Sequence, residues 1–152
     1  MREVIFVIKY FVVVYLLNFF WEAWHAYYLY WGYAGKSFKD YTVSEYLALI
    51  SKVSLIDAGL LVAILLIGYL IWKDIFWMDR IFKNFVRAET VYFLLTTFGV
   101  ATWIEIKGVY LFKEWSYLPT MPIIFGLGLS PLVQLAVAGL LSSWILTIHY
   151  KL

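Results

Sequence analysis

Long apolar blocks, separated by short polar segments, run along the whole chain. The four blocks cover residues 4–33, 44–72, 85–112 and 130–149. A helix needs about 20 mostly apolar residues to cross the hydrocarbon core of a bilayer, and each block reaches that length. We therefore predict an all-α fold in which residues 1–152 form a single integral membrane domain, an antiparallel four-helix transmembrane bundle.

The segments between the blocks carry recognisable start and stop signals. Thr42, followed three residues later by Glu45, matches a capping box at the start of the second block. Ser130 followed by Pro131 is typical of the first turn of a helix. Residues 73–84 mix charges with bulky apolar side chains, which predicts an interfacial turn lying on the membrane.

The segment before the fourth block is predicted to be an ordered outer loop. Pro119 and Pro122 preclude a regular helix over residues 113–122, and glycines interrupt the apolar residues 123–129. Irregular backbone at membrane depth must be covered by protein or must line a cavity. This loop is expected either to rest at the interface or to dip inward as a short lid.

Composition supports a multi-pass protein of the cell membrane. Hydrophobic residues make up 64% of the chain and charged residues only 14%, whereas a soluble domain is about half apolar and about a quarter charged. The net charge of +2 and the lack of a basic stripe argue against nucleic acid as a partner. With no cysteine, the chain has no disulfide, thiol nucleophile or Cys-ligated metal.

Basic residues in the connecting segments predict the orientation. With four spans, the side of the membrane that holds both termini carries six basic residues, Arg2, Lys73, Arg80, Lys83, Arg87 and Lys151. The other side carries three, Lys36, Lys39 and Lys113. By the positive-inside rule, the N- and C-termini are both expected on the cytoplasmic side.

Polar residues from all four blocks fall at one depth, in the predicted outer half of the bilayer. They are Glu22 and His25, with Asn18 one turn before them, then Asp57, Glu105 and Gln134. An ionisable group in hydrocarbon costs at least about 2.5–3.5 kcal/mol, so such groups face the bundle and pair with one another. Their shared depth predicts a single pocket between the helices.

The residue types in this cluster suggest acid–base chemistry. Carboxyl and imidazole groups removed from water can exchange protons near neutral pH, so Glu22 and His25 are the candidate proton-transfer pair. Asp57 and Glu105 are candidates for a second acid or for orienting groups, and Asn18 and Gln134 for ligand binding. The alternative is that these polar residues only join helices.

Three tryptophans at a similar depth, Trp21, Trp24 and Trp103, allow two interpretations. Their faces could wall a ligand pocket and stabilise a cation formed on an isoprenoid-type lipid. They could equally belong to an outer aromatic belt.

We expect no cofactor. Glu22-x-x-His25 matches half of a di-metal bundle motif, but the second histidine, His149, is predicted at the opposite face of the membrane. A single metal held by His25, Glu22, Asp57 and Glu105 is the alternative. The chain has no Gly-rich phosphate loop, Gly-x-Ser-x-Gly or His-Glu-x-x-His sequence.

The favoured function is binding of an apolar lipid or isoprenoid-type ligand in an outer-leaflet pocket, with acid–base chemistry of the isomerase or cyclase kind. Membrane lipids and a lipid-like small molecule are the expected partners. One alternative is a small proton- or ion-coupled transporter or channel subunit, which would need a homo-oligomer to form a pore. Another is a non-catalytic accessory protein.

Overall fold

The computed structural model describes residues 1–151, apart from the side chains of residues 149–151, so the side chain of His149 lies outside the described part. The described chain is mostly helical, as predicted. Four long helices dominate it: α1 (Arg2–Tyr28), α2 (Val43–Trp72), α4 (Ala88–Glu105) and α5 (Leu129–Lys151). Three of them, α1, α2 and α5, are long and apolar enough to cross a membrane. These helices indicate a membrane protein.

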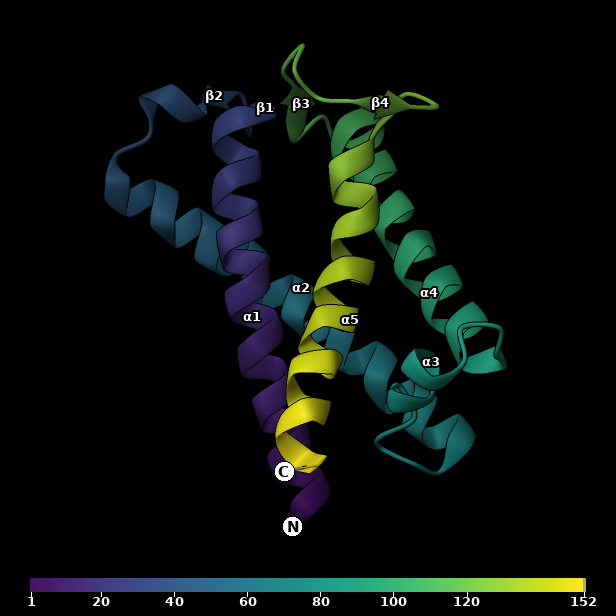
Figure 1. Cartoon of the computed structure of the whole chain (residues 1–152). Coiled ribbons are helices and arrows are strands. Elements are labelled where there is room, and N and C mark those ends of the chain that lie inside the picture. Colours follow the sequence, from purple (N-terminus) through teal and green to yellow (C-terminus); the bar gives the residue numbers. More distant parts are fainter. Residues whose placement is uncertain (152) are drawn as a thin grey trace.

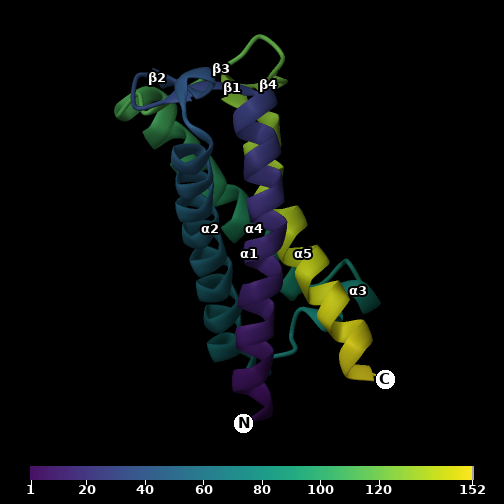
Figure 2. The same cartoon turned by 90° about the vertical axis from the view of Figure 1, so that its left-hand side faces the viewer.

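The long helices lie side by side and alternate in direction along the chain. Helix α1 packs along α2 and α5, and α5 also packs against α4 (Figure 1). The view turned by 90° shows α1 and α2 running next to each other (Figure 2). Both termini lie at one end of the molecule, called here the terminus end, and the short strands lie at the other, called the strand end.

At the strand end the chain forms a small sheet that was not predicted. Strand β1 (Tyr30–Tyr33) pairs antiparallel with β2 (Lys36–Ser37) on one side and with β3 (Trp115–Tyr117) on the other. The helix predicted over residues 4–33 therefore ends early, at Tyr28. Residues 30–33 instead form backbone hydrogen bonds with β2 and β3. The local periodicity of the sequence does not reveal such pairing with other segments.

The segment between α4 and α5 is ordered. A π-helix, η2 (Ile106–Leu111), follows α4, so the α-helix predicted as far as residue 112 is also shorter than expected. Beyond β3 the chain makes a second small hairpin from β4 (Ile123–Ile124) and β5 (Leu127–Gly128), which leads directly into α5.

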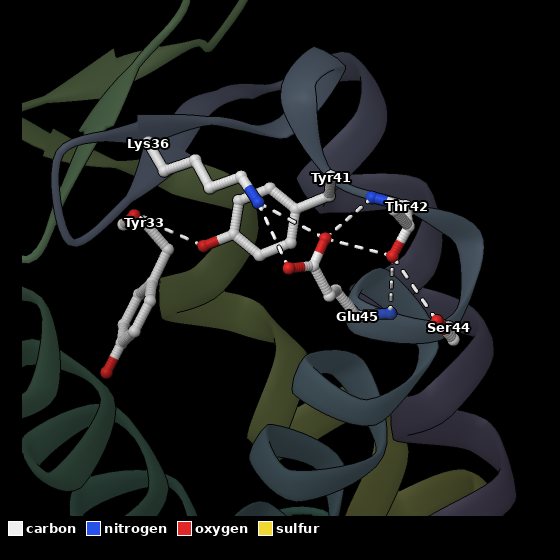
Figure 3. A network of polar contacts seen from close by, with 6 residues as sticks. All are labelled: Tyr33, Lys36, Tyr41, Thr42, Ser44 and Glu45. Atoms are coloured by element: carbon white, nitrogen blue, oxygen red, sulfur yellow. Dashed lines mark hydrogen bonds and ion pairs between the residues drawn. The ribbon is translucent and has the colours of Figure 1, made fainter.

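Polar contacts connect the start of α2 to the sheet formed by β1, β2 and β3 (Figure 3). The Thr42 hydroxyl accepts from the Glu45 backbone N–H, and the Glu45 carboxylate accepts from the Thr42 N–H at 2.8 Å. This confirms the predicted capping box. Lys36 lies 3.2 Å from both Glu45 oxygens and 4.4 Å from the centre of the Tyr41 ring, whose hydroxyl donates to the Tyr33 carbonyl. A short 3₁₀ helix, η1 (Phe38–Asp40), precedes the cap.

The link between α2 and α4, for which the sequence predicted an interfacial turn over residues 73–84, contains α3 (Asp79–Lys83) and packs on the core. Its apolar side chains Ile75, Trp77, Met78 and Ile81 are at most 3% exposed and belong to the main core. The Trp77 indole donates to the Leu65 carbonyl at 3.0 Å. The link therefore folds back against the helices, and the burial of these apolar side chains in the core stabilises that arrangement.

Ion pairs join several charged groups of the link. Arg80 lies 2.7 Å from Asp74 and 3.3 Å from Glu89 at the start of α4. The hydrogen bond that Arg80 donates to the Asp74 carboxylate raises the pKa of the guanidinium above its usual value, so this group stays charged. The pairs attach the link to α4 at the terminus end.

Candidate functional site

A pocket lies between α1, α2, α4 and α5 near the strand end, partly covered by β1, η1 and β3. Its cavity volume is about 100 Å³, and one water molecule needs about 10–15 Å³, so several waters or one small ligand group would fit. Most of the lining is apolar or aromatic: Ala26, Tyr30, Tyr33, Phe38, Leu49, Ile50, Val53, Ala101, Ile104, Trp115, Pro131 and Leu135. The polar lining consists of Glu22, Asp57, Glu105 and Gln134.

Gln134 is the centre of the polar cluster. Its Nε2 lies 3.0 Å from Asn18 Oδ1, 2.6 Å from Glu22 Oε1 and 3.3 Å from Asp57 Oδ2. One amide on α5 therefore joins α1 and α2 at the depth where the sequence predicted a pocket. A side-chain amide has only two N–H protons, so it cannot satisfy all three acceptors at once.

The α1 side of this network is fixed by helix geometry. Asn18 and Glu22 are four residues apart and project from the same face of α1. Asn18 is fully buried, and its Nδ2 donates to the Val14 carbonyl at 3.0 Å, which leaves Oδ1 to accept from Gln134. The orientation of the Asn18 amide is thus set by its own helix.

Glu105 lines the same pocket but has different partners. The Tyr30 hydroxyl donates to its Oε1 at 3.2 Å, and the Tyr117 hydroxyl donates to its Oε2. Burial and this contact raise the pKa of Tyr117, which keeps the phenol protonated as a donor. Both tyrosines come from the small sheet, so β1 and β3 hold the last residue of α4 in place.

The hydrogen-bond partners of His25 are not the carboxylates. The ring is fully buried; its Nε2 accepts from the Trp21 indole at 3.0 Å and contacts the Ser130 hydroxyl, while Nδ1 has no partner within the described residues. Glu22 instead bonds to Gln134. Although close in sequence, the two candidate proton-transfer residues are directed to different parts of α5, and His25 positions the start of that helix.

Two of the candidate wall tryptophans lie on the outside. Trp24 is 50% exposed and Trp103 is 58% exposed, and neither lines the pocket. Each is two residues from a pocket carboxylate, and residues two apart on a helix do not face the same way. Trp21 is half-buried and contacts His25. These placements correspond to the aromatic-belt alternative for Trp24 and Trp103.

The carboxylates do not form a compact ligand set for a metal. Within the described residues, no three His, Asp or Glu side chains gather closely enough to hold an ion. Of the four residues in the single-metal alternative, His25 has its Nε2 engaged by Trp21 and Ser130.

Sequence reasoning did not connect Tyr30 and Tyr117 with Glu105. They lie far apart along the chain and meet at Glu105 only because β1 pairs with β3. No local pattern signals this contact. Comparison with protein-family models, curated proteins and solved structures finds no match to this chain, so the site is interpreted from its own geometry.

Proposed function

We propose that the protein is a multi-pass protein of the cell membrane that binds a lipid- or isoprenoid-type ligand in this pocket. In this proposal α1, α2, α4 and α5 form four antiparallel spans, with both termini in the cytoplasm and the strand end outside. Two features support the arrangement: both termini lie at one end (Figure 1), and the basic residues are concentrated on that side of the chain.

The observation that carries the proposal is the two-part lining of the pocket. Leu49, Val53 and Ile104 provide apolar walls, while Glu22 and Asp57 provide a polar end. Concave sites with mostly apolar walls and a few convergent polar groups are the usual form of small-molecule sites. An amphipathic ligand fits this lining, with its chain against α2 and α4 and its polar group among the carboxylates.

The carboxyl groups also allow acid–base chemistry on the ligand. A protonated carboxyl group gives its O–H proton to a basic atom or a double bond of the ligand, and a neighbouring carboxylate takes a proton back, so the number of protons is conserved. Glu22 and Asp57, joined through Gln134, are the pair best arranged for this exchange. Glu105 is a second acid, and His25 is a positioning residue.

Packing at the terminus end favours binding over conduction through a single chain. Large side chains fill the bundle below the polar cluster, among them Tyr10, Trp77 and Phe93, each at most 1% exposed. A conduction path within one chain would have to cross this apolar core. Transport therefore remains the alternative function, and ion flux in liposomes tests it.

The test is photo-crosslinking in intact membranes from inside and outside the pocket. A benzophenone amino acid replaces Leu49, which lines the pocket, or Leu47, which is 45% exposed on the same helix. The Leu49 variant should capture one narrow class of lipid-like molecule, and that adduct should be lost when Glu22→Gln is added. The Leu47 variant should capture bulk lipids.

The same experiment separates the other functions. An identical spread of bulk lipids from both positions, unchanged by Glu22→Gln, would contradict the proposal. Capture of a protein from the pocket position would favour an accessory role, and carboxylate-dependent ion flux in liposomes would favour transport.

A further inference from the structure

We infer that the ligand of this pocket is a lipophilic amine, an apolar chain that ends in a protonated amino group. The inference rests on the proposed function, because it names the class of ligand for the same pocket. Charge, hydrogen-bond donors and the lining of the pocket each support it.

The pocket contains several carboxyl groups and no basic side chain of the protein to pair with them. Three carboxyl groups line it, those of Glu22, Asp57 and Glu105, and no lysine, arginine or histidine is among the described residues of the lining. The ion pairs in the described part of the chain, such as Lys36 with Glu45, leave all three out. A ligand cation would supply the missing positive charge.

The pocket also has more acceptors than donors. The donors near the three carboxyl groups are the two Gln134 N–H groups, the hydroxyls of Tyr30 and Tyr117, and the buried indole N–H of Trp115. Three ionised carboxyl groups present six acceptor oxygens, one more than these five donors. Asp57 is only 8% exposed, and hydrogen bonding from the described residues reaches its Oδ2 but not its Oδ1. A protonated amine brings three donors and no acceptor, which matches this deficit.

The spacing of the carboxyl groups and the aromatic lining of the pocket favour an organic cation over a metal ion. The carboxyl groups line one cavity, but among the described residues no three of them are close enough to form an ion's coordination shell. Tyr30, Tyr33 and Phe38 add aromatic rings to the lining, and such rings attract organic cations. The apolar lining from α2 and α4 contacts the part of the alkyl chain next to the amino group.

The experiment measures binding of dodecylamine and dodecan-1-ol to the purified full-length protein in mild detergent at pH 7, by titration calorimetry. The two probes share an alkyl chain, so their difference reports the amino group. We expect the amine to bind at least tenfold more tightly than the alcohol. Asp57→Asn should reduce the amine affinity at least tenfold, while Glu3→Gln, an exposed change on α1, should leave it unaltered.

Each outcome separates this inference from the proposed function. Equal binding of amine and alcohol, or full amine affinity in a folded Asp57→Asn variant, would overturn the amine assignment and leave a lipid-binding pocket. Saturable binding of neither probe would count against both. If Asp57→Asn does not fold, Glu22→Gln replaces it with the same expectations. Displacement of the amine by micromolar Zn²⁺ or Ca²⁺ would move the assignment to a metal ion.

Discussion

Gln134 shows how one side chain can organise a polar cluster between helices. The amide joins three helices through Asn18, Glu22 and Asp57, and it is itself only 3% exposed. Buried acceptors without donors are costly, because each has lost its hydrogen bonds to water. The amide therefore allows two carboxyl groups to approach each other inside an apolar bundle.

Replacing Gln134 by leucine should destabilise the protein. The substitution keeps a similar volume but leaves the three acceptors without this donor, at a cost of about 1–3 kcal/mol for a buried unsatisfied group. Thermal unfolding in detergent should show a clear decrease in the midpoint. Leu141→Ala, at a 43% exposed position of the same helix, is the control and should have a much smaller effect. An unchanged midpoint for Gln134→Leu would show that the network contributes little to stability.

For individual residues, the sequence predicted which side chains gather in the polar cluster, but not all of their contacts. Residue types and depth along the predicted helices were enough to group Glu22, Asp57 and Gln134, and helix spacing placed Asn18 beside Glu22. The direction of each side chain was harder to predict, because His25 points to Ser130 and not to the carboxylates. Contacts such as Tyr117 with Glu105 depend on strand pairing and have no local signal.

Among the elements, the link between α2 and α4 has packing that its composition did not predict. Its mixture of charges and large apolar residues resembles an interfacial segment, yet Trp77 is buried against α2. Gly68 makes this approach possible, because a Cβ added there would lie 2.3 Å from Cε2 of Trp77. The small residue that accommodates Trp77 lies on another element, so composition of the link alone could not reveal the packing.

Alanine substitutions at two glycines of α2 should therefore change the stability of the protein in opposite directions. Gly68→Ala forces the Trp77 ring to move and should cost about 1–3 kcal/mol through overpacking. Gly59→Ala has no heavy atom within 4 Å of the new Cβ and should stabilise the helix by about 0.5–1 kcal/mol. Unfolding midpoints of the two variants test this, and equal changes would contradict the packing of the link.

The long helices and the capping box at Thr42 were predictable because their signals are local. A block of about 20 apolar residues or a Thr-x-x-Glu spacing is complete within one stretch of sequence. The strands β1 and β3 are different: each is a short aromatic segment whose conformation depends on the other. Residues 30–33 therefore looked like a continuation of α1.

For the whole molecule, the proposed topology places η1 and the α2–α4 link on opposite sides of the membrane. Because the chain has no cysteine, single cysteines at the exposed positions Lys39 and Asn84 report each side without background. We expect Lys39→Cys to react with a membrane-impermeant maleimide on intact cells. Asn84→Cys should react only after the cells are permeabilised.

Other labelling patterns would correct the topology in defined ways. The reverse pattern would keep the spans but invert the orientation. Labelling of both positions on intact cells would mean that α2 does not cross the membrane, which would rule out the four-span arrangement.

The central claim, a ligand held among the carboxylates, is tested most directly by native mass spectrometry of the purified protein in mild detergent. The wild-type protein should carry a discrete extra mass that is lost in Glu22→Gln and kept in Glu3→Gln. That mass would also identify the ligand and give the oligomeric state. A bare protein mass in all three samples would contradict the claim and leave the polar cluster with a structural role alone.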